Sequence, residues 1–232
     1  LTQKGIRQHE EIATRMAKNF PELFNQKGLK VDVLSSVFPR CLMSMSAFCD
    51  ALKTQNPTIE ITRDASNAKM EQIHNIKPEW NPTLPDEVLE VVTSNNSIWR
   101  QRFIEYGNKH IDHSRVLNNL FNDKEYLRTA IDGNKFWRYL AELVVNVQCL
   151  DIEDVCLYDI FTKDELYEHW RTGNFAHYAK YGRYIYYPMM SQVTSKMLKA
   201  IIEQIDSDLA AGTPSISLRF GHDTCIFAIS PM

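Results

Sequence analysis

Residues 215–224 read Ser-Ile-Ser-Leu-Arg-Phe-Gly-His-Asp-Thr, and this stretch decides the fold. Ile216 and Leu218 alternate with polar residues, which is typical of a strand with one buried face, and the following glycine ends the strand. His222 and Asp223 would then lie at the carboxyl end of that strand, the edge at which open α/β sheets bind their ligands. The pattern therefore predicts an α/β protein with a ligand site at this edge. The alternative is a His-Asp pair that only caps a turn.

An imidazole beside a carboxylate suits the cleavage of an anionic ester. His222 would face the negative charge of the substrate, and Asp223 would protonate the leaving oxygen. The same strand end thus supplies both a cation and a general acid.

The first 66 residues show the strand, helix, strand rhythm of a parallel sheet. Thr2 predicts the start of an amphipathic helix that Pro21 ends. A short strand is predicted over 31–35, a helix follows Arg40, and a second strand is predicted around 59–61. The α/β pattern returns near the end of the chain, where apolar residues recur at helical spacing over 190–209 and Gly212 stops the helix.

The composition changes from about residue 67 onward. All four tryptophans and all ten tyrosines lie between residues 67 and 187. Long helical patterns are predicted over 86–106 and 123–150, and Thr162 and Glu165 form a capping box before a helix that ends near Gly182. We therefore expect an α/β core over 1–66 and 188–232, with a mostly helical insertion over 67–187.

The composition excludes several classes of protein. A hydrophobic content of 44% and a charged content of 24% in 232 residues indicate a folded chain with a full core. No apolar run approaches the ~20 residues that a membrane-spanning helix needs. The formal net charge of -3 gives no sign of a nucleic-acid-binding protein. The cysteines lack metal-ligand spacing, so no metal site and no cofactor are expected.

Arg40 is the second candidate site residue. It follows Pro39 at a predicted strand-to-helix junction, where backbone N–H groups and the helix dipole favour a phosphate. A guanidinium at this place can hold two phosphate oxygens in a fixed fork. The alternative is a surface arginine beside a proline. Ser44, one turn further along, is expected to be structural, and the histidines at 9, 74, 169 and 177 are expected to be solvated or capping.

Three segments in this order resemble the histidine acid phosphatases, branch 2 of the histidine phosphatase superfamily. They are Leu-Thr-Gln-Lys-Gly-Ile-Arg-Gln at 1–8, Ser-Val-Phe-Pro-Arg-Cys-Leu-Met-Ser at 36–44, and Arg-Phe-Gly-His-Asp-Thr at 219–224. The resemblance implies a phosphoglycerate-mutase-like core with a helical cap. It also implies a phosphohistidine intermediate, with Arg40 and His222 as phosphate ligands and Asp223 as proton donor.

The family's nucleophilic histidine lies in an Arg-His-Gly motif upstream of the first of these segments, and the 232 residues contain no Arg-His-Gly. We therefore expect the chain to be the interior of a longer enzyme. Lys180 and Arg183, near the end of the insertion, are candidate contacts to peripheral phosphates; the alternative is a solvated charged face. The resemblance further implies a periplasmic or secreted location.

The substrate expected first is an inositol polyphosphate, as in phytases and bacterial multiple inositol polyphosphate phosphatases. The His-Asp form at 222–223 is more usual in other acid phosphatases and phytases, so a broad-specificity acid phosphatase is the alternative. A non-catalytic phosphate-binding module and an interaction domain on the same fold remain alternatives of another class.

Overall fold

The computed structural model describes residues 1–74, 79–80, 84–147, 157–181 and 192–230. The chain divides into two compact units, one formed by Leu1–Val92 with Pro188–Met232 and the other by Thr93–Tyr187. Residues 67–92, which the composition placed in the insertion, group with the first unit. The domain boundaries given above stay a prediction, and each unit is described by itself.

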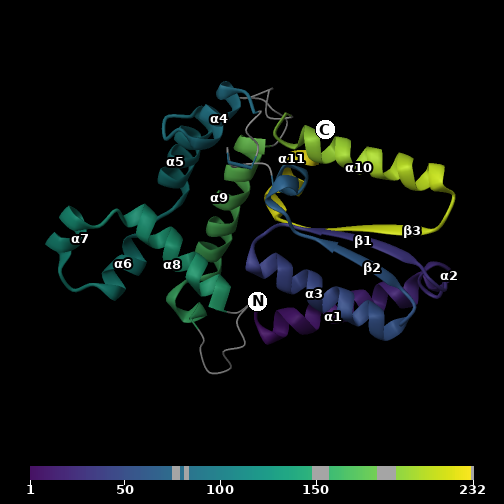
Figure 1. Ribbon diagram of the computed structural model, residues 1–232. Helices are drawn as coiled ribbons and strands as arrows, with labels where there is room; N and C mark the ends of the chain where they lie inside the picture. The colour runs from purple at the N-terminus through teal and green to yellow at the C-terminus, as the bar shows by residue number, and fades with distance from the viewer. Residues whose placement is uncertain (75–78, 81–83, 148–156, 182–191, 231–232) are drawn as a thin grey trace. The chain divides into compact units, whose positions relative to one another are not determined.

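The first unit contains a parallel three-stranded sheet in the order β2-β1-β3 (Figure 1). Its strands are β1 (Lys30–Ser35), β2 (Glu60–Asp64) and β3 (Ser215–Phe220). Val33 of β1 stands opposite Arg63 of β2 and Leu218 of β3. Because β1 is central and both neighbours run parallel to it, the ends of β1 and β3 meet at one edge. The expected α/β class is confirmed.

Two long helices cover one face of the sheet, α1 (Gln3–Asn19) and α3 (Pro39–Gln55), as Figure 1 shows. The short helix α2 (Pro21–Phe24) follows α1, because Pro21 ends one helix and begins the next. As expected, the Thr2 hydroxyl caps α1 by accepting the N–H of Gly5 at 3.1 Å. The core between these helices and the sheet includes Ala13, Val31, Val33, Phe48, Cys49, Leu52 and Ile216.

We expect Leu52→Ala to lower the free energy of unfolding of the first unit by about 2–5 kcal/mol. The Leu52 side chain is fully buried in this core, so its truncation removes apolar contacts and leaves a cavity. Denaturant unfolding followed by tryptophan fluorescence and circular dichroism measures the change. Leu209→Ala is the matched control, since Leu209 is 74% exposed and should change stability by less than about 0.5 kcal/mol. Equal losses in the two variants would contradict the assignment of Leu52 to the core.

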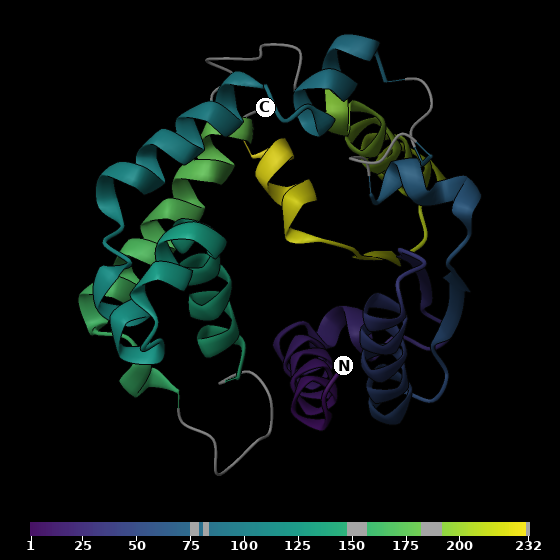
Figure 2. The ribbon, with the colours of Figure 1, turned by 90° about the vertical axis from the view of Figure 1, so that its left-hand side faces the viewer.

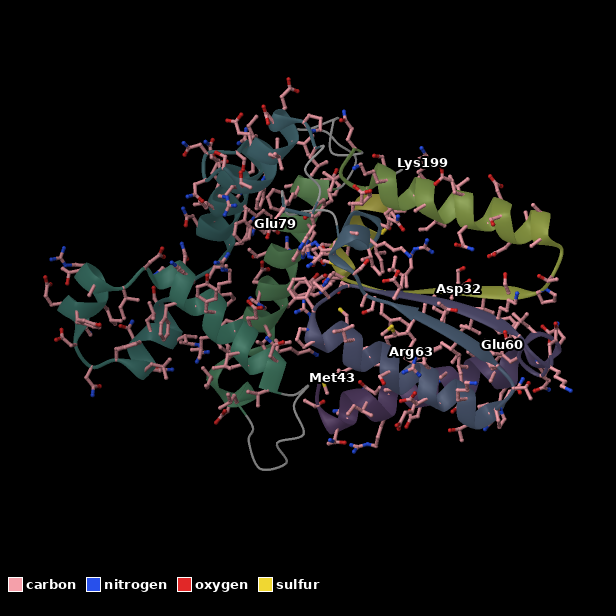
Figure 3. All side chains as sticks on the ribbon, in the orientation of Figure 1. Asp32, Met43, Glu60, Arg63, Glu79 and Lys199 are labelled. Carbon is pink, nitrogen blue, oxygen red and sulfur yellow. The ribbon has the colours of Figure 1, made fainter. Side chains whose placement is uncertain are left out.

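The opposite side of the sheet carries α10 (Gln192–Ala211), and α11 (Asp223–Ile229) follows β3 (Figure 2). The 3₁₀ helix η1 (Asn67–Gln72) packs against α10, and α4 (Asp86–Thr93) ends the first stretch of this unit. Asp32 of β1 points to the side of α10, whereas Arg63 of β2 points toward α3 and pairs with Asp50 at 2.6 Å (Figure 3). Pleating therefore sends alternate residues of each strand to opposite faces of the sheet.

The apolar face predicted for α10 is buried along only part of the helix. The apolar residues of its predicted face are buried only near its beginning, at Val193 and Met197. Ile205 is 52% exposed and Leu209 is 74% exposed, so apolar side chains of the second half of the helix face solvent. The helix does end as expected, with Gly212 in the left-handed conformation at φ 63°.

The elements of the second unit are all helices among its described residues. It contains α5 (Ile98–His110), α6 (Ser114–Leu120), α7 (Lys124–Ala130), α8 (Gly133–Val147), η2 (Tyr158–Ile160) and α9 (Lys163–Tyr181). Its largest buried side chain, Trp137, packs with Val116, Val144 and Phe161. The capping box is confirmed, since Thr162 and Glu165 exchange hydrogen bonds of 2.7 and 3.2 Å.

Two predicted long helices are each two helices in the structure. The pattern over 86–106 is broken between α4 and α5, where the Ser94 hydroxyl accepts the N–H of Asn96 and forms a turn. The pattern over 123–150 is broken before α8, where the Asp132 carboxylate accepts the N–H of Lys135 and starts a new helix. Short polar side chains bonded to nearby backbone N–H groups thus override the apolar periodicity. No helix among the described residues is long and apolar enough to cross a membrane.

Candidate functional site

Arg40 and His222 meet at the carboxyl edge of the sheet, although they lie 182 positions apart. Arg40 stands in the first turn of α3, and His222 stands between β3 and α11. A guanidinium nitrogen of Arg40 lies 2.9 Å from Nδ1 of His222. The two residues that the sequence proposed as ligands of one anion are therefore in direct contact.

The hydrogen bonds of His222 fix the form of its ring. Arg40 can only donate, so Nδ1 of His222 accepts, and the ring proton lies on Nε2. Nε2 then donates to the hydroxyl of Ser36 at 3.1 Å. Burial, followed by the positive charge of Arg40, lowers the pKa of His222, and the nearby Asp223 partly opposes this shift. In the free site the lowered pKa favours the neutral imidazole, with one nitrogen turned to a cation.

A cluster of aromatic rings packs on His222. Its ring centre lies 4.6 Å from that of His74 and 5.0 Å from that of Phe38, both nearly perpendicular to it. Trp80 in turn contacts His74 at 4.7 Å and Phe38 at 5.3 Å. The rings limit the movement of the imidazole and exclude water from one of its sides.

Sequence reasoning missed His74, Trp80 and Ser36. His74 was expected to be a solvated or capping residue, but it follows η1, is half-buried, and lies against His222. No local pattern marks it, because the contact depends on tertiary structure. For Ser36, the available signal was its place four residues before Arg40, in the segment that leads into α3.

Gly221 lets the chain carry His222 close to η1. A Cβ atom at this position would lie 3.0 Å from Cγ1 and 3.1 Å from the carbonyl oxygen of Ile73, closer than ordinary van der Waals contact. The glycine is therefore needed for close approach of two backbone segments rather than for a special φ angle. Asp223, the next residue but one, is exposed in the first turn of α11, and its carboxylate accepts the N–H of Thr224 at 2.8 Å.

The residues that adjoin Arg40 and His222 line a cleft of about 400 Å³. Cys41, buried in α3, directs its thiol toward the carbonyl oxygen of Gly221 at 3.4 Å. The Ser44 hydroxyl donates to the carbonyl of Arg40 at 3.0 Å, as a structural serine does. The rest of the cleft is mostly apolar and is lined by His9, Ile12, Met16, Phe48, Leu218, Arg219 and Phe220.

Of the two residues predicted to contact peripheral phosphates, Lys180 is among the described residues and Arg183 is not. Lys180 is partly buried in the second unit, where its ammonium group lies 5.2 Å from the ring centre of Trp99 and 4.9 Å from that of Tyr181. Arg183 lies outside the described residues. The role of both in ligand binding stays a prediction.

The arrangement offers positive donors to an anion. Arg40 stands at the amino end of α3, where the helix dipole adds to its charge, and a protonated His222 would supply a second donor. The carboxyl group of Asp223, the residue after His222, is exposed. The described residues contain no group of three or more His, Cys, Asp or Glu side chains that could hold a metal ion.

Comparison with known proteins agrees with this geometry. The model of the histidine phosphatase superfamily (branch 2) matches residues 1–230. Among solved structures, the chain is similar to the multiple inositol polyphosphate phosphatase of Bifidobacterium longum in complex with inositol hexasulfate, with a TM-score of 0.75 and 13% sequence identity. The match covers 99% of this chain but 62% of that one, so the chain spans less than two thirds of that relative. A search of curated proteins found no match. The chain belongs to the histidine phosphatase superfamily, branch 2, and has its α/β fold.

Proposed function

We propose that this chain forms the phosphate-binding and proton-donating part of a phosphomonoester hydrolase of the histidine acid phosphatase type. The observation that carries the proposal is the 2.9 Å contact between Arg40 and His222 at the carboxyl edge of the sheet. Family membership supports the same conclusion. Arg40, His222 and the amino end of α3 together form an anion site beside an accessible carboxyl group.

In the proposed reaction, a histidine attacks phosphorus and the bond from phosphorus to the ester oxygen breaks. Asp223 gives its proton to the departing oxygen, and the phosphoryl group is carried on the histidine. Water then attacks the phosphohistidine, with Asp223 accepting its proton, and releases phosphate. The charge on the transferred group is stabilised by Arg40 and by a protonated His222. The family resemblance implies an attacking histidine in an Arg-His-Gly motif, which these 232 residues do not contain.

We propose an inositol polyphosphate as the substrate, because the similar structure is an inositol polyphosphate phosphatase. A second candidate is a broad range of phosphomonoesters, and the apolar lining of the cleft beside Arg40 favours it. Ile12, Met16 and Phe48 offer little to the peripheral phosphates of a polyanion, whereas they suit an uncharged leaving group.

The test is phosphate release by the protein as its gene encodes it, with phytate, glucose 6-phosphate and phenyl phosphate compared at equal concentration. A clear preference for phytate in kcat/KM supports the first substrate, and a preference for phenyl phosphate supports the second. Protein-bound phosphate after brief incubation with a radiolabelled ester would identify the covalent intermediate. If phosphate is bound but none is released from any ester, the chain is a non-catalytic phosphate-binding module.

We expect the affinity for inorganic sulfate to increase as the pH falls from neutral toward the lowered pKa of His222 in the free site. The pKa of His222 is lowered in the free site, and a bound dianion would raise it, so sulfate binding takes up a proton. Sulfate is chosen because it stays a dianion throughout this range. Calorimetric titration in buffers of different ionisation enthalpy measures the uptake. His222→Gln should flatten the pH dependence, and an unchanged slope in that variant would contradict this role of His222.

A further inference from the structure

The second unit contains a groove of about 450 Å³ whose lining shares no residue with the candidate site. It is formed by α5 and α8, and Arg100, Lys135 and Arg138 lie in its lining. Asp132 is the one carboxylate among its described lining residues, so three cations face one anion. That carboxylate is already engaged, since it caps α8 by accepting the N–H of Lys135 at 3.0 Å.

Neutral groups hold the two guanidinium groups in place. Arg138 lies 5.5 Å from the ring centre of Phe103 and 4.9 Å from that of Tyr139. Arg100 lies 4.8 Å from the ring centre of Trp99 and donates to the carbonyl of Ser94 at 3.2 Å. Both are half-buried, and no carboxylate of the described residues pairs with either of them or with Lys135. The positive charge of the groove is therefore not neutralised by those parts of the chain.

The pKa of Lys180, which does not line the groove, also responds to the charge of Arg100. Lys180 lies 5.2 Å from the ring centre of Trp99, the same ring that Arg100 contacts. Burial, and then the charge of Arg100, lowers the pKa of Lys180 to about 8. Burial is the main cause of this shift, and the charge of Arg100 adds a smaller positive potential at Lys180.

We propose that this groove is a second anion site, which binds a phosphate group of a small molecule. Arg100 uses Nε for the carbonyl of Ser94, so its other guanidinium nitrogens and those of Arg138 can donate to phosphate oxygens. The side chains of Asn95 and Asn108 add neutral polar groups to the lining. The volume lies in the range of small-molecule sites, and the apolar lining at Phe103, Ile104 and Ile111 lowers the local dielectric constant. The site does not depend on the phosphatase proposal, because all its residues belong to the second unit.

The experiment is calorimetric titration of Arg40→Ala with inorganic pyrophosphate at low ionic strength. This variant lacks the guanidinium of the candidate active site, so one remaining binding event is expected. Adding Arg138→Met should weaken it about tenfold, as the loss of a charge-assisted hydrogen bond would. Lys163→Met is the matched control, because it removes one exposed positive charge of the same unit outside the groove and should leave the affinity unchanged.

Two further measurements complete the test. Titration with glucose 6-phosphate shows whether the groove prefers an organic phosphate to an inorganic one.

Bound pyrophosphate should also raise the pKa of Lys180 and slow its acetylation, and Arg138→Met should remove this effect. If Arg138→Met fails to fold, Lys135→Met tests the same groove from an exposed position. No binding to Arg40→Ala, or an equal loss in Lys163→Met, would overturn the proposal.

Discussion

Arg40→Ala is expected to lower kcat/KM for phosphate release by about 10³-fold. The guanidinium stands at the amino end of α3, 2.9 Å from His222, where it can hold two oxygens of the transferred phosphoryl group. Because charge on these oxygens is stabilised most in the transition state, kcat should fall as well as affinity. Steady-state kinetics of the protein as its gene encodes it give both values.

Arg40→Lys should recover only a small part of the loss, because an ammonium group cannot form the planar two-point contact. Lys53→Met on the same helix is the control for charge, since it removes a cation at the other end of α3. A loss with Lys53→Met as large as that with Arg40→Ala would mean that net charge, rather than this contact, determines the rate.

Asp223→Asn is expected to lower turnover of alkyl phosphates by about 10²- to 10⁴-fold, and that of p-nitrophenyl phosphate much less. An alkoxide needs a proton in order to leave, whereas p-nitrophenolate leaves readily without one. Asp223 is exposed in the first turn of α11 beside His222, so a substrate oxygen can reach it. The ratio of kcat/KM for the two substrates in wild type and variant measures the effect.

Asp206→Asn is the control, because it removes a carboxylate from an exposed position on α10. It should leave both substrates unaffected. Equal losses on both substrates with Asp223→Asn would exclude Asp223 as the proton donor, and would leave it a role in orienting the first turn of α11.

Local signals in the sequence determined the α/β class and the principal elements. The alternation of Ile216 and Leu218 predicted β3, the cap at Thr2 and the proline at 21 fixed the bounds of α1, and the capping box at Thr162 began α9. These features depend on residues within one turn or one strand, so the chain specifies them locally. The same reasoning failed where apolar periodicity continued across a turn, at Ser94 and Asp132, because a side-chain hydrogen bond to the backbone decides such breaks.

The sequence by itself also named Arg40, His222 and Asp223, because each stands at a strand or helix end that a local pattern marks. It did not determine that Arg40 and Ser36 fix the ring form of His222, or that His74 packs on it. Only the tertiary structure decided these contacts, as it decided that three cations of α5 and α8 share one groove. The physical reason is that parallel pairing of β1 with β3 brings residues that are far apart in the sequence to one edge of the sheet. No local periodicity shows which side chains meet there.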